Sequence, residues 1–196
     1  MKSYLSARRL CLWAVNAILV LGLACVPIIG RTAENSWPML ERDAPKLELV
    51  LQLVVTCTGP ERVGGSEDSK DGKRTEIWPI VGGRFQGRGI RGTVIPGGGD
   101  FPVVRPDGVE VVDALYRLRT DDGVTIIIHN KGLGYPGKSP DDWHYRLFPE
   151  FIAPKGKYAW LNSNLFLATL SEVPEGMRLA KGPTENDRLI QVYRVL

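Results

Sequence analysis

VEVVDALYRLRTDDGVTIIIHN, residues 109–130, is the stretch of sequence that decides the fold. Its first half alternates between two unlike faces, which is the period of a β-strand. One face holds Val112, Ala114, Tyr116 and Leu118, and the other holds Asp113, Leu115, Arg117 and Arg119. Asp122-Gly123 then supplies the positive φ that a tight hairpin turn requires. The stretch therefore predicts two antiparallel strands with one core face and one face toward solvent or a polar lumen.

The rest of the body repeats this pattern of short apolar runs separated by Gly, Pro and Asp. No segment from residue 46 onward has a sustained apolar repeat at helical spacing. The runs are LELVLQLVVTC, RTEIWPIVG, GIRGTVIP, VEVVDALYRLR, VTIIIHN, WHYRLFPEFIA, YAWLNSNLFLATL and RLIQVYRVL. They predict an all-β domain of about eight strands. Closure into one antiparallel barrel removes the exposed edges, and an open β-sandwich is the alternative.

Composition narrows the classes of function. The chain has 196 residues and a net charge of +3, without a long basic run, so nucleic acid is not an expected partner. Cys57 is the lone cysteine of the body, and the two histidines have no spaced acid near them in the sequence. We therefore expect no disulfide, no metal and no cofactor. The oligomeric state does not follow from the sequence.

The N-terminus has the pattern of a secretory signal or a signal anchor. Residues 1–9 form a basic tail, residues 10–30 an uncharged apolar run, residues 31–45 a polar linker, and residues 46–196 the β domain. We favour an uncleaved signal anchor that spans the membrane once through residues 10–30, because the candidate cleavage sites are poor. The positive-inside rule then places the body on the luminal or extracellular side. Secretion after cleavage is the alternative.

Six motifs in order carry a family resemblance: GGRFQG, IRGTVIPGGGD, VRPDG, VVDALYRLRTDDG, IHNKG and YAWLN. From about Leu47 to Val195 the chain resembles the family called domain of unknown function 3237. The resemblance implies an eight-stranded antiparallel barrel of lipocalin-like or allene-oxide-cyclase-like shape. Phe101, where the family usually has Trp, and the N-terminal segment depart from the family pattern.

Asp100 is the leading candidate for chemistry. It follows Gly97-Gly98-Gly99, and a partly buried carboxylate at a barrel mouth has a pKa suited to moving a proton. Arg91 and Arg105 flank it in the sequence, and a guanidinium binds a carboxylate or enolate oxygen in bidentate fashion. Asn162 in the YAWLN motif is expected either to orient a carbonyl or hydroxyl or to hold a bend between strands. The alternative is that Asp100 caps a glycine-rich turn.

Five further residues are candidates for ligand contact, each with a structural alternative. They are Arg105, Asp113, Tyr116, His129 and Trp160. Asp113 is costly inside a barrel unless it is paired and ordinary outside it. Tyr116 and Trp160 suit a core or a pocket wall, and His129 stands at a strand end.

The sequence leaves two main functions open, and a structural protein with a filled core is a third, weaker option. Some fungal relatives in the family work in natural-product pathways, which implies cofactor-free cyclisation, isomerisation or dehydration of an apolar, oxygen-bearing small molecule. Asp100 would then be the acid or base, with Arg91 or Arg105 holding negative charge and Asn162 orienting a carbonyl. The alternative is a barrel that binds or carries a hydrophobic ligand without chemistry.

Overall fold

Alternating apolar residues and frequent turn residues make the body an all-β unit. The structure, a computed structural model, describes residues 42–64, 71–139, 142–182 and 184–196. In this part of the chain the elements are strands and two 3₁₀ turns. In chain order they are β1 (Leu47–Thr58), β2 (Glu61–Val63), β3 (Arg74–Gly87), β4 (Ile90–Asp100), β5 (Val103–Val104), β6 (Glu110–Thr120), β7 (Thr125–Pro136), β8 (Trp143–Ile152), η1 (Ala159–Asn162), β9 (Phe166–Ser171), η2 (Glu175–Met177) and β10 (Glu185–Val195).

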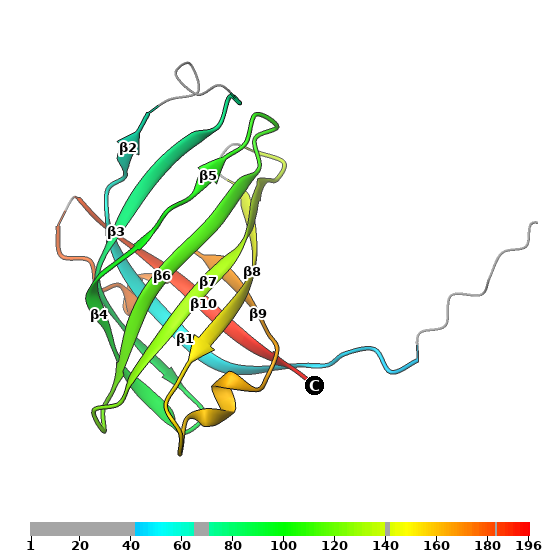
Figure 1. Cartoon of the computed structure of the whole chain (residues 1–196). Helices are drawn as coiled ribbons and strands as arrows, with labels where there is room; N and C mark the ends of the chain where they lie inside the picture. Colours follow the sequence, from blue (N-terminus) through cyan, green and yellow to red (C-terminus); the bar gives the residue numbers. More distant parts are fainter. Residues whose placement is uncertain (1–41, 65–70, 140–141, 183) are drawn as a thin grey trace, which may run out of the picture. The chain divides into compact units, whose positions relative to one another are not determined.

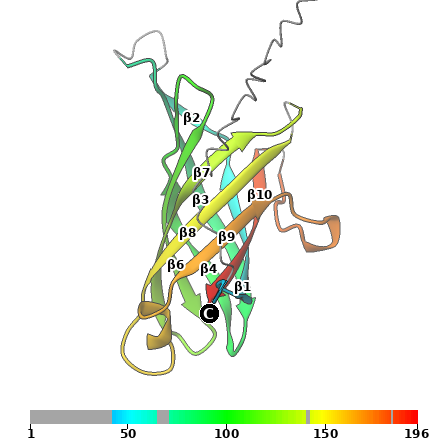
Figure 2. The ribbon, with the colours of Figure 1, turned by 90° about the vertical axis from the view of Figure 1, so that its right-hand side faces the viewer.

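Eight of the strands form a closed antiparallel barrel. Their order is β1-β10-β9-β8-β7-β6-β4-β3, and β1 also pairs with β3, which closes the sheet. Figures 1 and 2 show the tilted strands wrapping around one axis. The short strands β2 and β5 extend the wall beside β3 and β6. The predicted eight-stranded barrel is confirmed, and the open sandwich is wrong.

The central hairpin forms as predicted. β6 and β7 pair without interruption from Glu110 opposite Gly134 to Arg119 opposite Thr125. The face of Val112, Ala114, Tyr116 and Leu118 is buried, and Leu118 has no exposed surface. The face of Asp113 points to solvent. The apolar face is therefore the inside of the barrel, where alternate residues of all eight strands meet in one core.

Antiparallel pairing gives the barrel two unlike ends. At one end, called here the Asp100 end, β4 finishes at Asp100 while β6 begins at Glu110. At the other end, called the η1 end, β4 begins at Ile90 and the chain turns through η1 between β8 and β9. In Figure 1 the η1 end is at the bottom, and β2 and β5 are at the top.

The YAWLN motif plugs the η1 end rather than forming a strand. Tyr158 and Leu161 are 4% and 2% exposed and belong to the main core. The Tyr158 hydroxyl donates to Asp122 over 2.9 Å. Asn162 donates to the Ala153 carbonyl and accepts from the Ala153 N–H, both at 2.8 Å. These bonds fold the segment back under the barrel, so the expected strand over residues 158–170 is wrong before β9.

The triple glycine lies inside β4, not in a turn. Gly97 has φ of 92°, a conformation that side chains rarely adopt, and the pairing of β4 shifts between Ile95 and Gly99. At Gly98 a Cβ atom would lie 2.5 Å from the Tyr116 Cβ. The glycines thus bend β4 and let it approach β6, which places Asp100 at the end of a strand.

The N-terminal predictions stand outside the described residues. Residues 1–41, which include the predicted membrane or signal segment 10–30 and most of the linker, are not described. Among the described residues, no helix has the length and apolar character needed to cross a membrane.

Gly98→Ala is expected to lower the free energy of unfolding by about 1–3 kcal/mol, because the new methyl overlaps the Tyr116 side chain in a packed wall. Urea titration of both proteins measures the difference. Gly59→Ala is the matched control, since a Cβ there meets no atom within 4 Å. Equal stability of Gly98→Ala and the wild type would contradict the close approach of β4 and β6.

Candidate functional site

A cavity of about 100 Å³ opens at the Asp100 end of the barrel. Seven strands contribute to it, because each presents an inward side chain near the same end. The lining residues are Cys57, Glu76, Trp78, Asp100, Glu110, Val112, Tyr145, Leu170 and Arg188. Its apolar walls and its convergent charged groups together have the character of a small-molecule site.

Asp100 stands at the inner edge of this cavity. Its Oδ1 accepts a hydrogen bond from the Asp113 backbone N–H at 3.1 Å. Burial raises the pKa of Asp100 from 3.8 to about 6, the Asp113 charge adds to the rise, and backbone hydrogen bonds and Arg188 oppose it. Asp100 therefore titrates close to neutral pH.

Glu110 is the second carboxyl of the cavity. Burial raises its pKa from 4.5 to about 7, the charges of Asp100 and Glu76 add to the rise, and Arg188 and Arg74 oppose it. Glu76 differs because it forms an ion pair with Arg74 at 3.4 Å, whereas among the described residues neither Asp100 nor Glu110 has such a partner. Two neighbouring carboxyls that titrate near neutrality give the cavity an acid and a base at once.

Arg188 is the cation among the nine lining residues. Its guanidinium lies over the Trp78 ring, 5.5 Å from the ring centroid, and its Nη1 donates to the Asp187 carbonyl at 3.1 Å. A guanidinium held over an aromatic face and close to carboxylates is positioned to bind an oxygen that gains negative charge.

The remaining walls are neutral at physiological pH. Burial raises the pKa of the Cys57 thiol to about 11, so this group is not a thiolate nucleophile. Burial also raises the pKa of Tyr145 well above its usual range. The Tyr145 ring packs against Gly134, where a Cβ would lie 2.3 Å from a ring carbon. The missing side chain of Gly134 thus makes room for this wall.

The structure does not bring Arg91 and Asn162 to Asp100. Arg91 lies at the start of β4 and pairs with Asp121 at 2.6 Å, and Asn162 binds the Ala153 backbone. Nine residues of extended strand span about 30 Å, so Arg91 and Asp100 stand at opposite ends of one strand. The predicted gathering of Asp100, Arg91 and Asn162 is wrong.

Most of the other candidates also lie away from the cavity. Arg105 pairs with Asp107 in the exposed β5–β6 turn. Asp113 and His129 pair with each other on the outer face of β6 and β7, and Trp160 packs on Phe166 at the η1 end, with ring centroids 6.0 Å apart. These four residues either lie on the surface or pack at the opposite end of the barrel. None of them lines the Asp100 cavity, so the predicted ligand contacts do not form there.

Tyr116 is the exception, because it points into the lumen beneath the cavity and is 2% exposed.

Glu110 and Arg188 were not predicted as site residues. Glu110 lies two residues from the inward-facing Val112 on β6, and Arg188 lies two residues from the inward-facing Ile190 on β10. Strand alternation would therefore have predicted that both side chains face the lumen.

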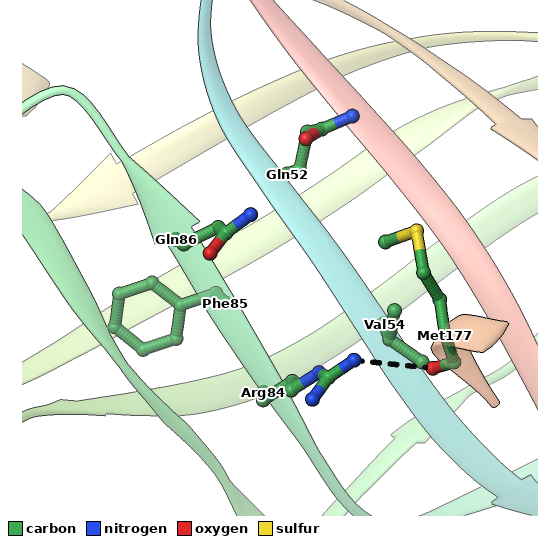
Figure 3. A pocket seen from close by; sticks show the side chains of 6 residues that line it. All are labelled: Gln52, Val54, Arg84, Phe85, Gln86 and Met177. Carbon is green, nitrogen blue, oxygen red and sulfur yellow. Dashed lines mark hydrogen bonds between the residues drawn. The ribbon is translucent and has the colours of Figure 1, made fainter. Parts of the chain in front are cut away.

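A larger hollow of about 250 Å³ lies on the outside of the barrel, between β1, β3 and the η2 segment (Figure 3). Gln52, Val54, Arg84, Phe85, Gln86 and Met177 line it. Arg84 donates to the Met177 carbonyl at 3.5 Å. Apart from Arg84, the residues that line this outer hollow include no titratable group, so the smaller Asp100 cavity is the better candidate for chemistry.

Fold and cavity define the class: closed eight-stranded antiparallel barrels with a charged cavity at one end. Residues 45–195 match the family model described as "Protein of unknown function (DUF3237)", and the chain belongs to this family. A UPF0311 protein of Clostridium acetobutylicum is 32% identical over 144 residues, which cover 67% of this chain and 89% of the relative. A UPF0311 protein of Rhodopseudomonas palustris is 33% identical over 106 residues, or 47% and 69% of the two chains.

Solved structures share the barrel. A Clostridium acetobutylicum protein of unknown function has a TM-score of 0.66 and 27% identity over 79% of this chain and 99% of its own. A β-barrel-like protein of Acinetobacter baumannii has a TM-score of 0.66 and 22% sequence identity, and the match covers 81% of this chain and 100% of that protein. A protein described as an enzyme from Penicillium herquei has a TM-score of 0.54 and 22% sequence identity, and the match covers 79% of this chain and 99% of that protein. The last two likenesses concern the fold alone.

Glu110→Gln is expected to change how stability depends on pH. Folding raises the pKa of Glu110 from 4.5 to about 7, so the folded protein holds this proton more tightly than the unfolded chain does. The resulting stability is complete below pH 4.5 and is lost as the pH rises through 7, with a slope that approaches about 1.4 kcal/mol per pH unit. Glu110→Gln removes this loss, measured as the difference in unfolding free energy across pH 4–8.

Glu150→Gln is the control for that experiment. The Lys131 ion pair lowers the pKa of Glu150 on the outer face, so any stability it adds is lost as the pH falls, which is the opposite sign. The burial of Glu110 in the cavity is disproved if Glu110→Gln and the wild type keep the same slope between pH 4.5 and 7.

Proposed function

We propose that this barrel is a cofactor-free acid–base enzyme that rearranges an apolar, oxygen-bearing small molecule in the Asp100 cavity. The observation that carries the proposal is the pair of half-buried carboxyls, Asp100 and Glu110, which line one cavity with Arg188. Carboxyls with a raised pKa in a cleft are typical of acid–base sites.

The roles follow from the two pKa values. Asp100 has the lower pKa, is mostly ionised at pH 7, and serves as the base that removes a proton from the substrate. Glu110, whose pKa is raised to about 7, is the carboxyl that holds its proton more tightly and serves as the acid. Arg188 binds the oxygen on which negative charge develops. The cation role expected for Arg91 or Arg105 therefore passes to Arg188.

The size and walls of the cavity limit the substrate. A volume of about 100 Å³ accepts the reacting part of a molecule rather than all of it. Trp78 and Tyr145 offer flat apolar faces, and Val112 and Leu170 complete an apolar frame around the charged groups. A flat or cyclic apolar compound with an oxygen function suits this frame.

The wider context belongs to the same proposal. Cyclisation, isomerisation and dehydration each need one proton removed and one supplied, which matches the carboxyl pair. The neighbour described as an enzyme from Penicillium herquei supports catalysis on this fold, and natural-product chemistry is the setting we propose. The membrane segment at residues 10–30, a luminal or extracellular barrel, and the absence of a metal or cofactor remain predictions from the sequence.

Proton abstraction can be tested before the natural substrate is known. In D₂O, the wild type is expected to catalyse deuterium incorporation next to the carbonyl of small cyclic ketones, followed by mass spectrometry. Asp100→Asn should slow the exchange by about 10²-fold or more. The rate should peak between pH 6 and 7, because the base must be ionised and the acid protonated, and Glu110→Gln should lose the alkaline limb.

Glu150→Gln, an outer carboxyl, is the matched control and should exchange at the wild-type rate. If the ketones bind and the wild type and Asp100→Asn exchange equally slowly, the barrel is a binding or carrier protein and the enzymatic proposal is wrong.

A further inference from the structure

Two polar atoms in the lumen lack a hydrogen-bond partner among the described residues. They are the Tyr116 hydroxyl and the Asn130 amide oxygen, each with less than 1 Å² of exposed surface. Tyr116 is 2% exposed and Asn130 is 1% exposed. Leaving a buried polar group unpaired costs about 1–3 kcal/mol, so each of these two atoms calls for a partner.

Neither residue lines the Asp100 cavity itself, but the strand register places both of them close to Asp100. The register places Asp100 opposite Ala114 on β6, and Ala114 opposite Asn130 on β7. Two strand spacings of about 4.8 Å therefore separate Asp100 from Asn130, and the side chain between them is only a methyl group. Tyr116 lies one inward position further along β6, where its hydroxyl comes within electrostatic range of both Cys57 and Asp100.

The chemistry of the two atoms selects a ligand group. An amide oxygen needs a donor, and a tyrosine hydroxyl can donate or accept. A carbonyl would satisfy Tyr116 alone. An ammonium would lose its hydration beside Leu118 and Ile128, which have no exposed surface. A neutral hydroxyl donates to one atom and accepts from the other, and so satisfies both.

We infer that a hydroxyl group of the substrate binds beneath the Asp100 cavity, donating to Asn130 and accepting from Tyr116. This inference rests on the proposed function and sharpens it, since it names the substrate as a hydroxyl-bearing compound. The hydroxyl enters first, and the rest of the molecule fills the space between Trp78 and Tyr145. Tyr116 and Asn130 fix the orientation, and Asp100 carries the proton transfer.

Three small probes test the hydroxyl requirement by NMR titration of the full chain. Phenol is expected to bind about 10-fold more tightly than toluene, which has the same shape with a methyl in place of the hydroxyl. Anisole, which cannot donate, should bind like toluene. A tenfold ratio corresponds to one well-formed hydrogen bond pair in a buried site.

Variants then separate binding from stability. Tyr116→Phe is expected to weaken phenol 5–10-fold, leave toluene unchanged, and raise the melting temperature of the ligand-free protein, because it removes an unpaired buried hydroxyl. Asn130→Leu, of similar shape, should act in the same direction on phenol. Tyr158→Phe is the matched control: its hydroxyl is paired with Asp122, so the melting temperature should fall while phenol affinity stays unchanged.

The inference is overturned if phenol and toluene bind Tyr116→Phe and the wild type with the same ratio. It is also overturned if Tyr116→Phe lowers the melting temperature, since the hydroxyl would then have a structural partner such as an internal water. These readouts are equilibrium ones. Selective phenol binding without any deuterium exchange would leave this site standing and remove only the catalytic proposal.

Discussion

The pairing of β1 with both β10 and β3 is the interaction on which the rest of the structure depends. A sheet that closes on itself has no free edge, and it divides every strand into residues that face the lumen and residues that face outward. Once the register is fixed, the alternation decides which side chains face the lumen, and outward side chains lose their water only where another segment covers them, as at Val54 and Leu189. The main core, the raised carboxyl pKa values and the unpaired lumen atoms all follow from this division.

The lumen is not uniformly apolar, and its polar groups are unevenly distributed. Leu118, Ile126 and Ile128 have no exposed surface and pack the β6–β7 wall towards its turn at the η1 end, whereas Asp100 and Glu110 stand near the opening at the other end. An interior made for stability alone would replace such acids with packed hydrocarbon, because burying a charge opposes folding. Keeping them there is a local violation of folding rules of the kind that marks functional sites.

The fold could be predicted further than the site. Alternation along residues 109–119 and the Asp122-Gly123 turn were enough to predict the hairpin, and eight such runs were enough to predict the barrel. The 3₁₀ turn at residues 159–162 was missed because its stability comes from tertiary bonds to Asp122 and Ala153, which no local pattern encodes. Arg91 was placed beside Asp100 because it is near in sequence, while an extended strand separates such neighbours. Glu110 and Arg188 could have been predicted only by extending the alternation of inward and outward residues to the ends of their strands.

Tyr158 and Leu161 of the η1 segment join the packed core of the lumen, which closes the barrel beneath the Asp100 cavity. A molecule that reaches the Asp100 cavity must leave by the route it came in, so its leading group is the first in and the last out. Selection then acts strongly on that leading group and weakly on whatever trails outside the rim.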